Sequence, residues 1–152
     1  MDLDTKLKKT RGFDVWLNVG RTNLKVHRAL NLSLAELDLS LAQHEILLSI
    51  WQNSGITQKK LAENLLVVKS NVSALIKKLE TRRLVHRECD PSDTRNKCLS
   101  LTEAGRELVQ KSFARQNRII DAMASVMSDD DLDRTAEVMR RVGNALDELL
   151  KK

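Results

Sequence analysis

A short stretch near the middle of the chain carries side chains suited to contacting nucleic acid. The pattern predicts a helix from about Lys69 to Arg82, and its apolar positions, among them Val72 and Ile76, define a buried face. Small side chains on the other face let a helix enter the major groove, where Asn pairs with adenine and Ser bonds several base edges. The candidate contact residues on that face are Lys69, Ser70, Asn71, Ser73, Ala74 and Lys77.

A second group of polar residues follows in a segment rich in turn formers, Asp90 to Asn96. The flanking stretches, 84–88 and 97–101, have strand character, and together they predict a β-hairpin with a charged tip. Arg95 at this tip is expected to reach into a minor groove, where negative potential concentrates. Lys97 is a further candidate contact.

The charge distribution agrees with a phosphate-binding surface in this region. Between Thr57 and Lys97 there are ten Lys and Arg residues against five Asp and Glu residues, whereas the flanking segments are close to neutral. The whole chain has a net charge of +5. A local basic surface is what binding to nucleic-acid phosphates requires, although a solvated basic surface without a partner fits the same numbers.

The remaining pattern predicts a mainly α-helical protein. Caps are expected at Ser40, in a capping box with Gln43, and at Thr57, Thr102 and Ser128. Asn31 to Leu39 is read as a connector. The expected helices are Phe13–Leu30, a helix from Ser40 to about Asn53, Gln58–Leu65, Lys69–Arg82, Glu103–Met127 and Asp129–Leu150.

The two long helices at the end of the chain have more apolar positions than a small core needs. Phe113, Ile120, Met139 and Leu146 are among them. We therefore expect these helices, with the first helix, to form a dimerisation module, and purely intramolecular packing is the alternative.

Residues Ser40 to Arg106 closely resemble the MarR family of transcriptional regulators. The matching stretches are Thr57-Gln58-Lys59-Lys60-Leu61-Ala62, Lys69 to Glu80, Leu84-Val85-His86-Arg87, Asp90 to Arg95 and Leu99 to Gly105. The resemblance implies a winged helix-turn-helix at 37–102, a helical dimerisation module at 1–36 and 103–152, and a homodimer on double-stranded DNA. It implies repression at a near-palindromic operator, relieved by a small molecule. It also implies that Asp93 orients Arg95.

Four positions depart from the family pattern. Thr94 replaces a common basic residue at the wing tip, Leu66 and Arg83 stand where Gly is frequent, and Val68 replaces the usual Ser cap. Ser70 could then cap the helix in place of contacting a base. These departures blur the expected start of the contact helix.

The resemblance also implies an inducer pocket for a small aromatic or phenolic ligand. The candidates by rough location are Trp16, Arg21, His27, His44 and Trp51, and plain core packing is their alternative role. Cys89 and Cys98 flank the wing tip nearly symmetrically, so they could lie across the hairpin from each other and form a redox pair. No metal site is expected, because the spacing of His86, Cys89 and Cys98 is not that of structural zinc.

Other functional classes find little support. The sequence has no nucleophile elbow, phosphate-binding loop or His-Glu-x-x-His motif, so we expect neither an enzyme nor a cofactor. Aromatic residues make up only 3% of the chain, which disfavours single-strand RNA recognition by stacking. A winged-helix module that binds another protein remains the alternative. The N-terminus lacks a signal-peptide core, and we expect a cytoplasmic protein.

Overall fold

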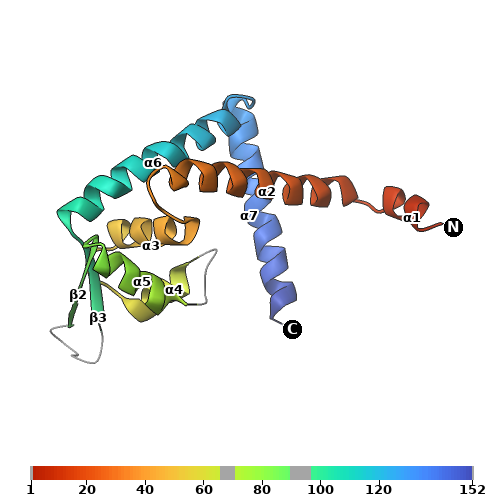
Figure 1. The fold of residues 1–152 in the computed structure, drawn as a ribbon. Helices are drawn as coiled ribbons and strands as arrows, with labels where there is room; N and C mark the ends of the chain where they lie inside the picture. The colour runs from red at the N-terminus through yellow and green to blue at the C-terminus, as the bar shows by residue number, and fades with distance from the viewer. Residues whose placement is uncertain (1, 66–70, 90–96, 152) are drawn as a thin grey trace. The chain divides into compact units, whose positions relative to one another are not determined.

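The computed structural model describes residues 2–65, 71–89 and 97–151, and of Cys89 only the backbone. The chain divides by its contacts into two compact units, Met1–Gln116 and Asn117–Lys152. Helices dominate both units, and a small sheet belongs to the first one (Figure 1). The mainly α fold with a β-hairpin wing is thus confirmed. No helix of the described residues is both long and apolar enough to cross a lipid bilayer.

In its described residues, the first unit contains five complete helices and the beginning of a sixth. Those that were predicted lie close to their expected positions, whereas α1 was not expected. The bounds are α1 Leu3–Lys9, α2 Phe13–Ala35, α3 Leu41–Gln52, α4 Gln58–Asn64, α5 Val72–Thr81 and α6 Glu103–Ala124.

Helix α2 is longer than the sequence pattern predicted. The expected connector at Asn31 is wrong, because the helix continues for one more turn to Ala35. Leu30 and Leu34, four residues apart on one face, are both buried, and this burial favours the extra turn. Asp38, at φ 53°, then turns the chain toward the next helix.

Side-chain caps set the starts of three helices of the first unit where the sequence predicted them. Ser40 and Gln43 form the capping box at α3, with Ser40 Oγ accepting from the Gln43 N–H at 3.2 Å. Thr57 Oγ1 accepts from the Lys60 N–H at the start of α4. Thr102 Oγ1 accepts from the Gly105 N–H at 3.0 Å at the start of α6.

Three antiparallel strands form the sheet, in the order β1-β3-β2. Strands β2 (Val85–Cys89) and β3 (Lys97–Leu101) are the predicted hairpin, called the wing here, whose tip lies outside the described residues. Strand β1 (Ile56–Thr57) was not predicted, because it is a two-residue pairing with the distant residues Leu99 and Cys98. The sheet therefore ties the wing to the start of α4.

A continuous apolar core joins the helices to the wing. Its side chains come from α2, α3, α4, α5 and α6 and from β3, and each is almost completely inaccessible to solvent. They include Leu34, Ile46, Leu47, Ile50, Leu61, Ile76, Leu79, Leu99 and Val109. Because α5 contributes Ile76 and Leu79 to this core, its opposite face is held at the surface.

A close backbone contact fixes the base of the wing against α6. The Thr102 N–H donates to the Leu84 carbonyl at 3.1 Å, and Thr102 Oγ1 donates to the Arg83 carbonyl at 2.7 Å. A Cβ atom added to Gly105 would lie 2.1 Å from the Leu84 carbonyl oxygen. Only glycine fits at this point, which explains the glycine that follows Leu-Thr in the sequence.

The second unit holds the end of α6 and all of α7 (Asp129–Leu150). Helix α6 ends at Ala124, earlier than the predicted Met127. The predicted cap of α7 is confirmed as a reciprocal pair between Ser128 and Asp131. Hydrogen bonds from the Ser128 side chain and backbone lower the pKa of the Asp131 carboxyl.

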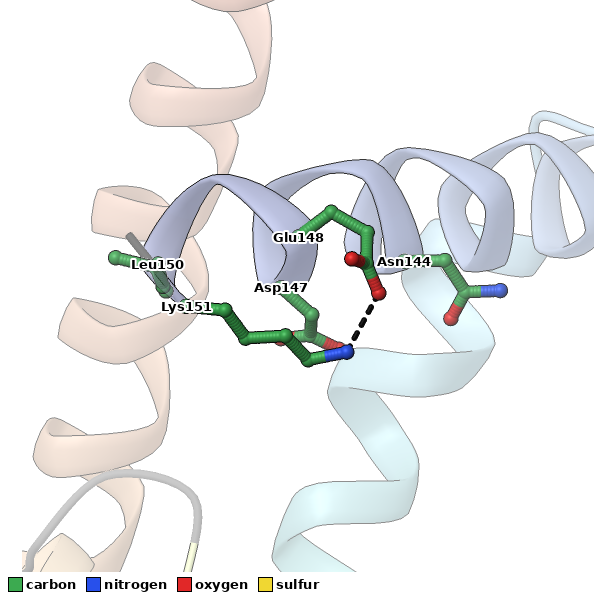
Figure 2. Close-up of a pocket in the computed structure, with 5 residues that line it drawn as sticks. All are labelled: Asn144, Asp147, Glu148, Leu150 and Lys151. Atoms are coloured by element: carbon green, nitrogen blue, oxygen red, sulfur yellow. Dashed lines mark hydrogen bonds and ion pairs between the residues drawn. The ribbon is translucent and has the colours of Figure 1, made fainter.

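Helix α7 has two chemically different sides. All its residues are described, and none of them is buried within the chain. Figure 2 shows polar residues over its last turns, where Lys151 Nζ lies 2.5 Å from Glu148 Oε1, near Asn144 and Asp147. The large apolar residues left exposed are Val138, Met139, Val142, Leu146, Leu149 and Leu150.

Candidate nucleic-acid interface

The outer face of α5 presents the predicted polar side chains to solvent. Asn71, Ser73 and Lys77 are exposed and Ala74 is half-buried, whereas Val72 and Ile76 are buried. The face thus combines an amide, a hydroxyl and an ammonium group on a helix whose other side is fixed in the core. Lys69 and Ser70 lie outside the described residues.

Helix α5 begins at Val72, three residues later than the sequence predicted. Its N-cap is Asn71, in the left-handed conformation at φ 64°, which Asn tolerates better than most residues. The Asn71 side chain makes no capping hydrogen bond with the described residues. The backbone carbonyl of Asn71, and not its side-chain carboxamide, accepts hydrogen bonds from the N–H groups of Ala74 and Leu75. The carboxamide therefore remains available to an external partner.

Ser73 links the two helices of the helix-turn-helix. The Gln58 Nε2 amide of α4 donates to Ser73 Oγ at 2.5 Å. This contact holds the start of α4 beside the outer face of α5, so that Gln58 belongs to the same surface. The sequence pattern did not identify Gln58, because nothing local shows that residues 58 and 73 meet.

A cation-lined hollow of about 530 Å³ borders the same face. Lys77 and Lys78 of α5 line it with Arg82, the residue that follows the helix, together with Asp38 and Gln43. Arg82 Nη1 donates to the Asp38 carbonyl at 2.7 Å, which holds that guanidinium beside the end of α2. Lys78 and Arg82 were missed as individual contacts, although the excess of basic residues between 57 and 97 included them.

The wing is tied to α5 by an ion pair. Arg87 Nη2 of β2 lies 2.9 Å from Glu80 Oε2, and both side chains are mostly shielded from solvent. This ion pair joins strand β2 to the C-terminal part of α5. Lys97 is exposed at the first position of β3, whereas Asp93 and Arg95 lie outside the described residues.

The strand register places the two cysteine positions on neighbouring strands of the wing. Cys98 pairs with Glu88 and Cys89 pairs with Lys97, so the two positions lie across the hairpin from each other, one residue out of register. A redox role for either cysteine stays a prediction. No group of three or more His, Cys, Asp or Glu among the described residues could hold a metal ion.

The structure does not bring the five candidate ligand residues together in one cavity. His27 and His44 line one cavity of about 480 Å³. Trp51 lines another, of about 390 Å³, with Val109 and Phe113. Within the described part of the chain, Trp16 and Arg21 line neither cavity; both are exposed, and Trp16 stacks on Phe13 with ring centroids 5.8 Å apart.

His44 is the most unusual polar group of the first cavity. Its side chain is 2% exposed, and Nε2 lies 2.8 Å from Gln116 Oε1. The other ring nitrogen, Nδ1, is buried without a hydrogen-bond partner among the described residues. Burial lowers the pKa of His44 below its ordinary value of 6.5, although Gln116 and the Glu45 carboxylate act in the opposite direction. The imidazole is therefore held in its neutral form.

Comparison with known proteins shows similarity to one class of regulators. The MarR family model matches residues 39–97. An uncharacterized HTH-type transcriptional regulator of Bacillus cereus is 30% identical over 107 residues, which are 70% of this chain and 71% of that protein. The HTH-type transcriptional regulator MhqR of Bacillus subtilis is 21% identical over 88% of this chain and 92% of its own length.

Solved structures show the same fold. The transcriptional repressor CouR bound to a 23-mer DNA duplex is 26% identical, with a TM-score of 0.76 over 91% of this chain and 95% of that one. The MepR–DNA complex of S. aureus is 22% identical, with a TM-score of 0.77 over 85% of this chain and 96% of that one.

Proposed function

Because this chain belongs to the MarR family of DNA-binding transcriptional regulators, we propose that it is a homodimeric repressor of a near-palindromic operator, released by a small-molecule ligand. The observation that carries the proposal is the outer face of α5, where exposed Asn71 and Lys77 lie opposite a fully buried apolar face. The chain acts, on this proposal, in the cytoplasm, where it meets the chromosome.

The chemistry of each side chain determines which part of the DNA we propose that it contacts. The Asn71 carboxamide reads a base edge in the major groove, since it is exposed and not used as a cap. Lys77 and Lys78 contact phosphates and set the register of the helix on the duplex. Arg95 and Lys97 of the wing reach the neighbouring minor groove, with Asp93 as the orienting partner of Arg95. Lys69, Ser70, Ser73 and Ala74 complete the proposed surface.

A second copy of the chain is the proposed partner of α7. An amphipathic helix without any buried residue leaves its apolar side in water, which is unfavourable by roughly 25 cal/mol per Å². Residues 1–36 and 103–152 form the proposed dimerisation module around this helix. A twofold dimer places two copies of α5 on successive turns of the major groove, so that the operator is a near-palindrome.

The cavity that contains His27 and His44 is the proposed effector site. It is lined by residues of α2 and α3 and by Gln116 of α6. A ligand that fits only one relative placement of these helices shifts the population toward that placement. DNA affinity falls where the two copies of α5 no longer match the operator spacing.

Selection of genomic fragments by the purified protein tests the proposal. We expect enrichment of a near-palindrome that is bound by a dimer, with affinity that falls steeply as salt rises. Absence of any enrichment over random DNA, both with and without extracts of small molecules, would instead favour a winged-helix module that binds protein.

The Asn71→Ala variant tests base reading. We expect its affinity for the selected operator to fall by about 1–3 kcal/mol while its affinity for random DNA stays unchanged. Ser125→Ala, at a solvent-exposed position of the second unit, is the control. Equal losses on both DNAs would show that Asn71 does not read a base.

A further inference from the structure

Gln58 and Ser73 form a polar pair that bridges the two helices of the helix-turn-helix. Gln58 is the first residue of α4, and its Nε2 amide donates to Ser73 Oγ of α5 across 2.5 Å. Ser73 is exposed and Gln58 is half-buried. Neither side chain makes another hydrogen bond among residues 2–65, 71–89 and 97–151. The hydrogen-bonding capacity that remains on both side chains is therefore open to an external partner.

The backbones that carry this pair are anchored in the fold. Thr57, directly before Gln58, belongs to strand β1, and its side chain caps α4. On α5, Val72 directly before Ser73 is buried, and Ile76 is completely inaccessible to solvent. Because the pair is already held in one arrangement, it loses little conformational entropy when it binds, and its geometry selects its partner.

The pair presents one hydrogen-bond donor beside one acceptor. Because Ser73 Oγ accepts from Gln58, the Ser73 hydroxyl proton is left to donate outward. Gln58 Oε1 belongs to the same amide group as the bonded Nε2, so this acceptor lies next to the hydroxyl. If the amide turns over, Ser73 donates to Oε1, Nε2 becomes the outward donor and Ser73 Oγ keeps an acceptor lone pair. Both orientations therefore leave a donor and an acceptor side by side.

The major-groove edge of one base satisfies both groups. Adenine offers the N7 acceptor beside the N6 amino donor. Guanine offers two acceptors, thymine offers an acceptor and a methyl group, and cytosine offers only a donor. Each of these three bases leaves the donor or the acceptor of the pair without a partner in the interface, which costs free energy.

From this arrangement we infer that Gln58 is a specificity-determining residue, and that Gln58 and Ser73 together read one adenine in each half of the operator. Ser73 donates to adenine N7, and Gln58 Oε1 accepts from the N6 amino group. The inference rests on the proposed function, in which the outer face of α5 enters the major groove. Phosphate contacts such as that of Lys77 add affinity without base preference.

Single-atom changes in the operator test this reading on the full-length protein. At each adenine of the selected operator in turn, 7-deazaadenine replaces N7 with carbon, and purine replaces the N6 amino group with hydrogen. We expect an adenine in each half-site where either change weakens binding about three- to tenfold, which corresponds to the loss of one hydrogen bond. Fluorescence anisotropy measures the affinities.

Two variants assign these losses to the pair. Ser73→Ala should bind the operator with 7-deazaadenine at this position as tightly as the operator with adenine. Gln58→Leu should lose the sensitivity to purine and most of the sensitivity to 7-deazaadenine, because Ser73 is then no longer oriented. Lys77→Ala is the control, since it should lower affinity for every duplex and keep both sensitivities. A purely structural role of Gln58 would give the same pattern as this control.

The isosteric variant Gln58→Glu tests the donor and acceptor pattern by a change of preference. A carboxylate has no N–H, so Ser73 donates to it and the pair presents acceptors alone. An acidic residue is favourable in the first turn of a helix, so α4 should remain folded, which circular dichroism checks. Selection of operators by this variant should replace adenine with cytosine, whose N4 amino group is a donor, at this position only.

The outcomes separate this inference from the proposed function. If an operator is bound by a dimer but both sensitivities persist at every adenine in Ser73→Ala and in Gln58→Leu, the pair does not read a base and the proposed repressor stands. Selection of guanine in place of adenine opposite the pair would also overturn the inference alone. Enrichment of no operator would overturn both.

Discussion

The winged-helix part of the chain and helix α7 bury apolar surface in different ways. Residues of α3, α5 and β3 bury Ile46, Ile76 and Leu99 completely within the chain. In α7, by contrast, even the best-shielded large apolar residues stay partly exposed, and Leu146 is 53% exposed. The first region buries its apolar side chains within the chain, whereas the second leaves an apolar side exposed, which is the side proposed to bind a second copy.

This difference separates two kinds of substitution. We expect changes within the winged-helix core to act on folding of a single chain, and changes on the apolar side of α7 to act on the proposed association. Changes at Asn71 and Lys77 on the outer face of α5 are expected to act mainly on the proposed binding to DNA.

Gly105→Ala is expected to have the largest effect on the winged-helix part. The added Cβ would lie 2.1 Å from the Leu84 carbonyl oxygen, and a backbone atom cannot move away without loosening the wing. We expect a loss of about 3 kcal/mol in the free energy of unfolding, measured by urea denaturation. Gly20→Ala, where an added Cβ meets nothing within 4 Å, should change stability by less than about 1 kcal/mol. Equal effects of the two substitutions would contradict the close contact.

Leu146→Asp is expected to weaken association and leave the winged-helix part folded. A carboxylate on the apolar side of α7 would be desolvated in a dimer, which costs roughly 2–3 kcal/mol in the dissociation free energy. Sedimentation equilibrium measures this change, and circular dichroism checks the fold. Asn144→Asp introduces the same charge on the polar side shown in Figure 2 and should leave the dimer unchanged. An unaltered dimer in both variants would show that α7 is not the interface.

Lys77→Ala is expected to reduce DNA affinity without changing the fold of the winged-helix part or the association proposed for α7. Loss of one phosphate contact should lower affinity by about 1 kcal/mol and reduce the salt slope by about 1. Fluorescence anisotropy over a salt series measures both quantities. Lys111→Ala, at an exposed position of α6, is the matched control, and an identical salt slope in all three proteins would remove Lys77 from the interface.

His44 is expected to cause the smallest effect, a dependence of stability on pH. Its pKa is lowered by burial in the folded chain, so the unfolded chain binds more protons near and below pH 6.5. Stability is therefore full above the ordinary pKa and falls as the pH drops through 6.5 toward the folded pKa. Among the residues that the structure describes, Glu45 and His27 are the other titratable groups that line the cavity. Denaturation of wild type and His44→Gln between pH 8 and 5 should show a flatter profile for the variant, and identical profiles of the two proteins would contradict the prediction.

Local signals in the sequence were sufficient for most helix starts. The caps at Ser40, Thr57, Thr102 and Ser128 depend on residues only three positions away, and all were predicted. The end of α2 was missed because the extra turn depends on burial of Leu34 in the tertiary core, and strand β1 was missed because Ile56 pairs with the distant residue Leu99.

The candidate site shows the same difference between features set by local sequence and features set by distant contacts. Exposure of Asn71 and Lys77 could be predicted, since it follows from helical spacing against Val72 and Ile76. The contact of His44 with Gln116, 72 residues away, and the link from Gln58 to Ser73 could not be predicted, because only the tertiary fold brings these side chains together. The family pattern frequently has Gly at position 83, which indicates a left-handed backbone there. Arg83 adopts that conformation, at φ 56°.

Hydroxyl-radical footprinting on the selected operator tests the central claim most directly, with sedimentation to count the chains on each duplex. The account predicts two chains per duplex and two protected segments related by the symmetry of the site, centred about 10 base pairs apart. Protection of one segment by a single chain would contradict it, because a monomer would then bind DNA while the apolar side of α7 stays uncovered.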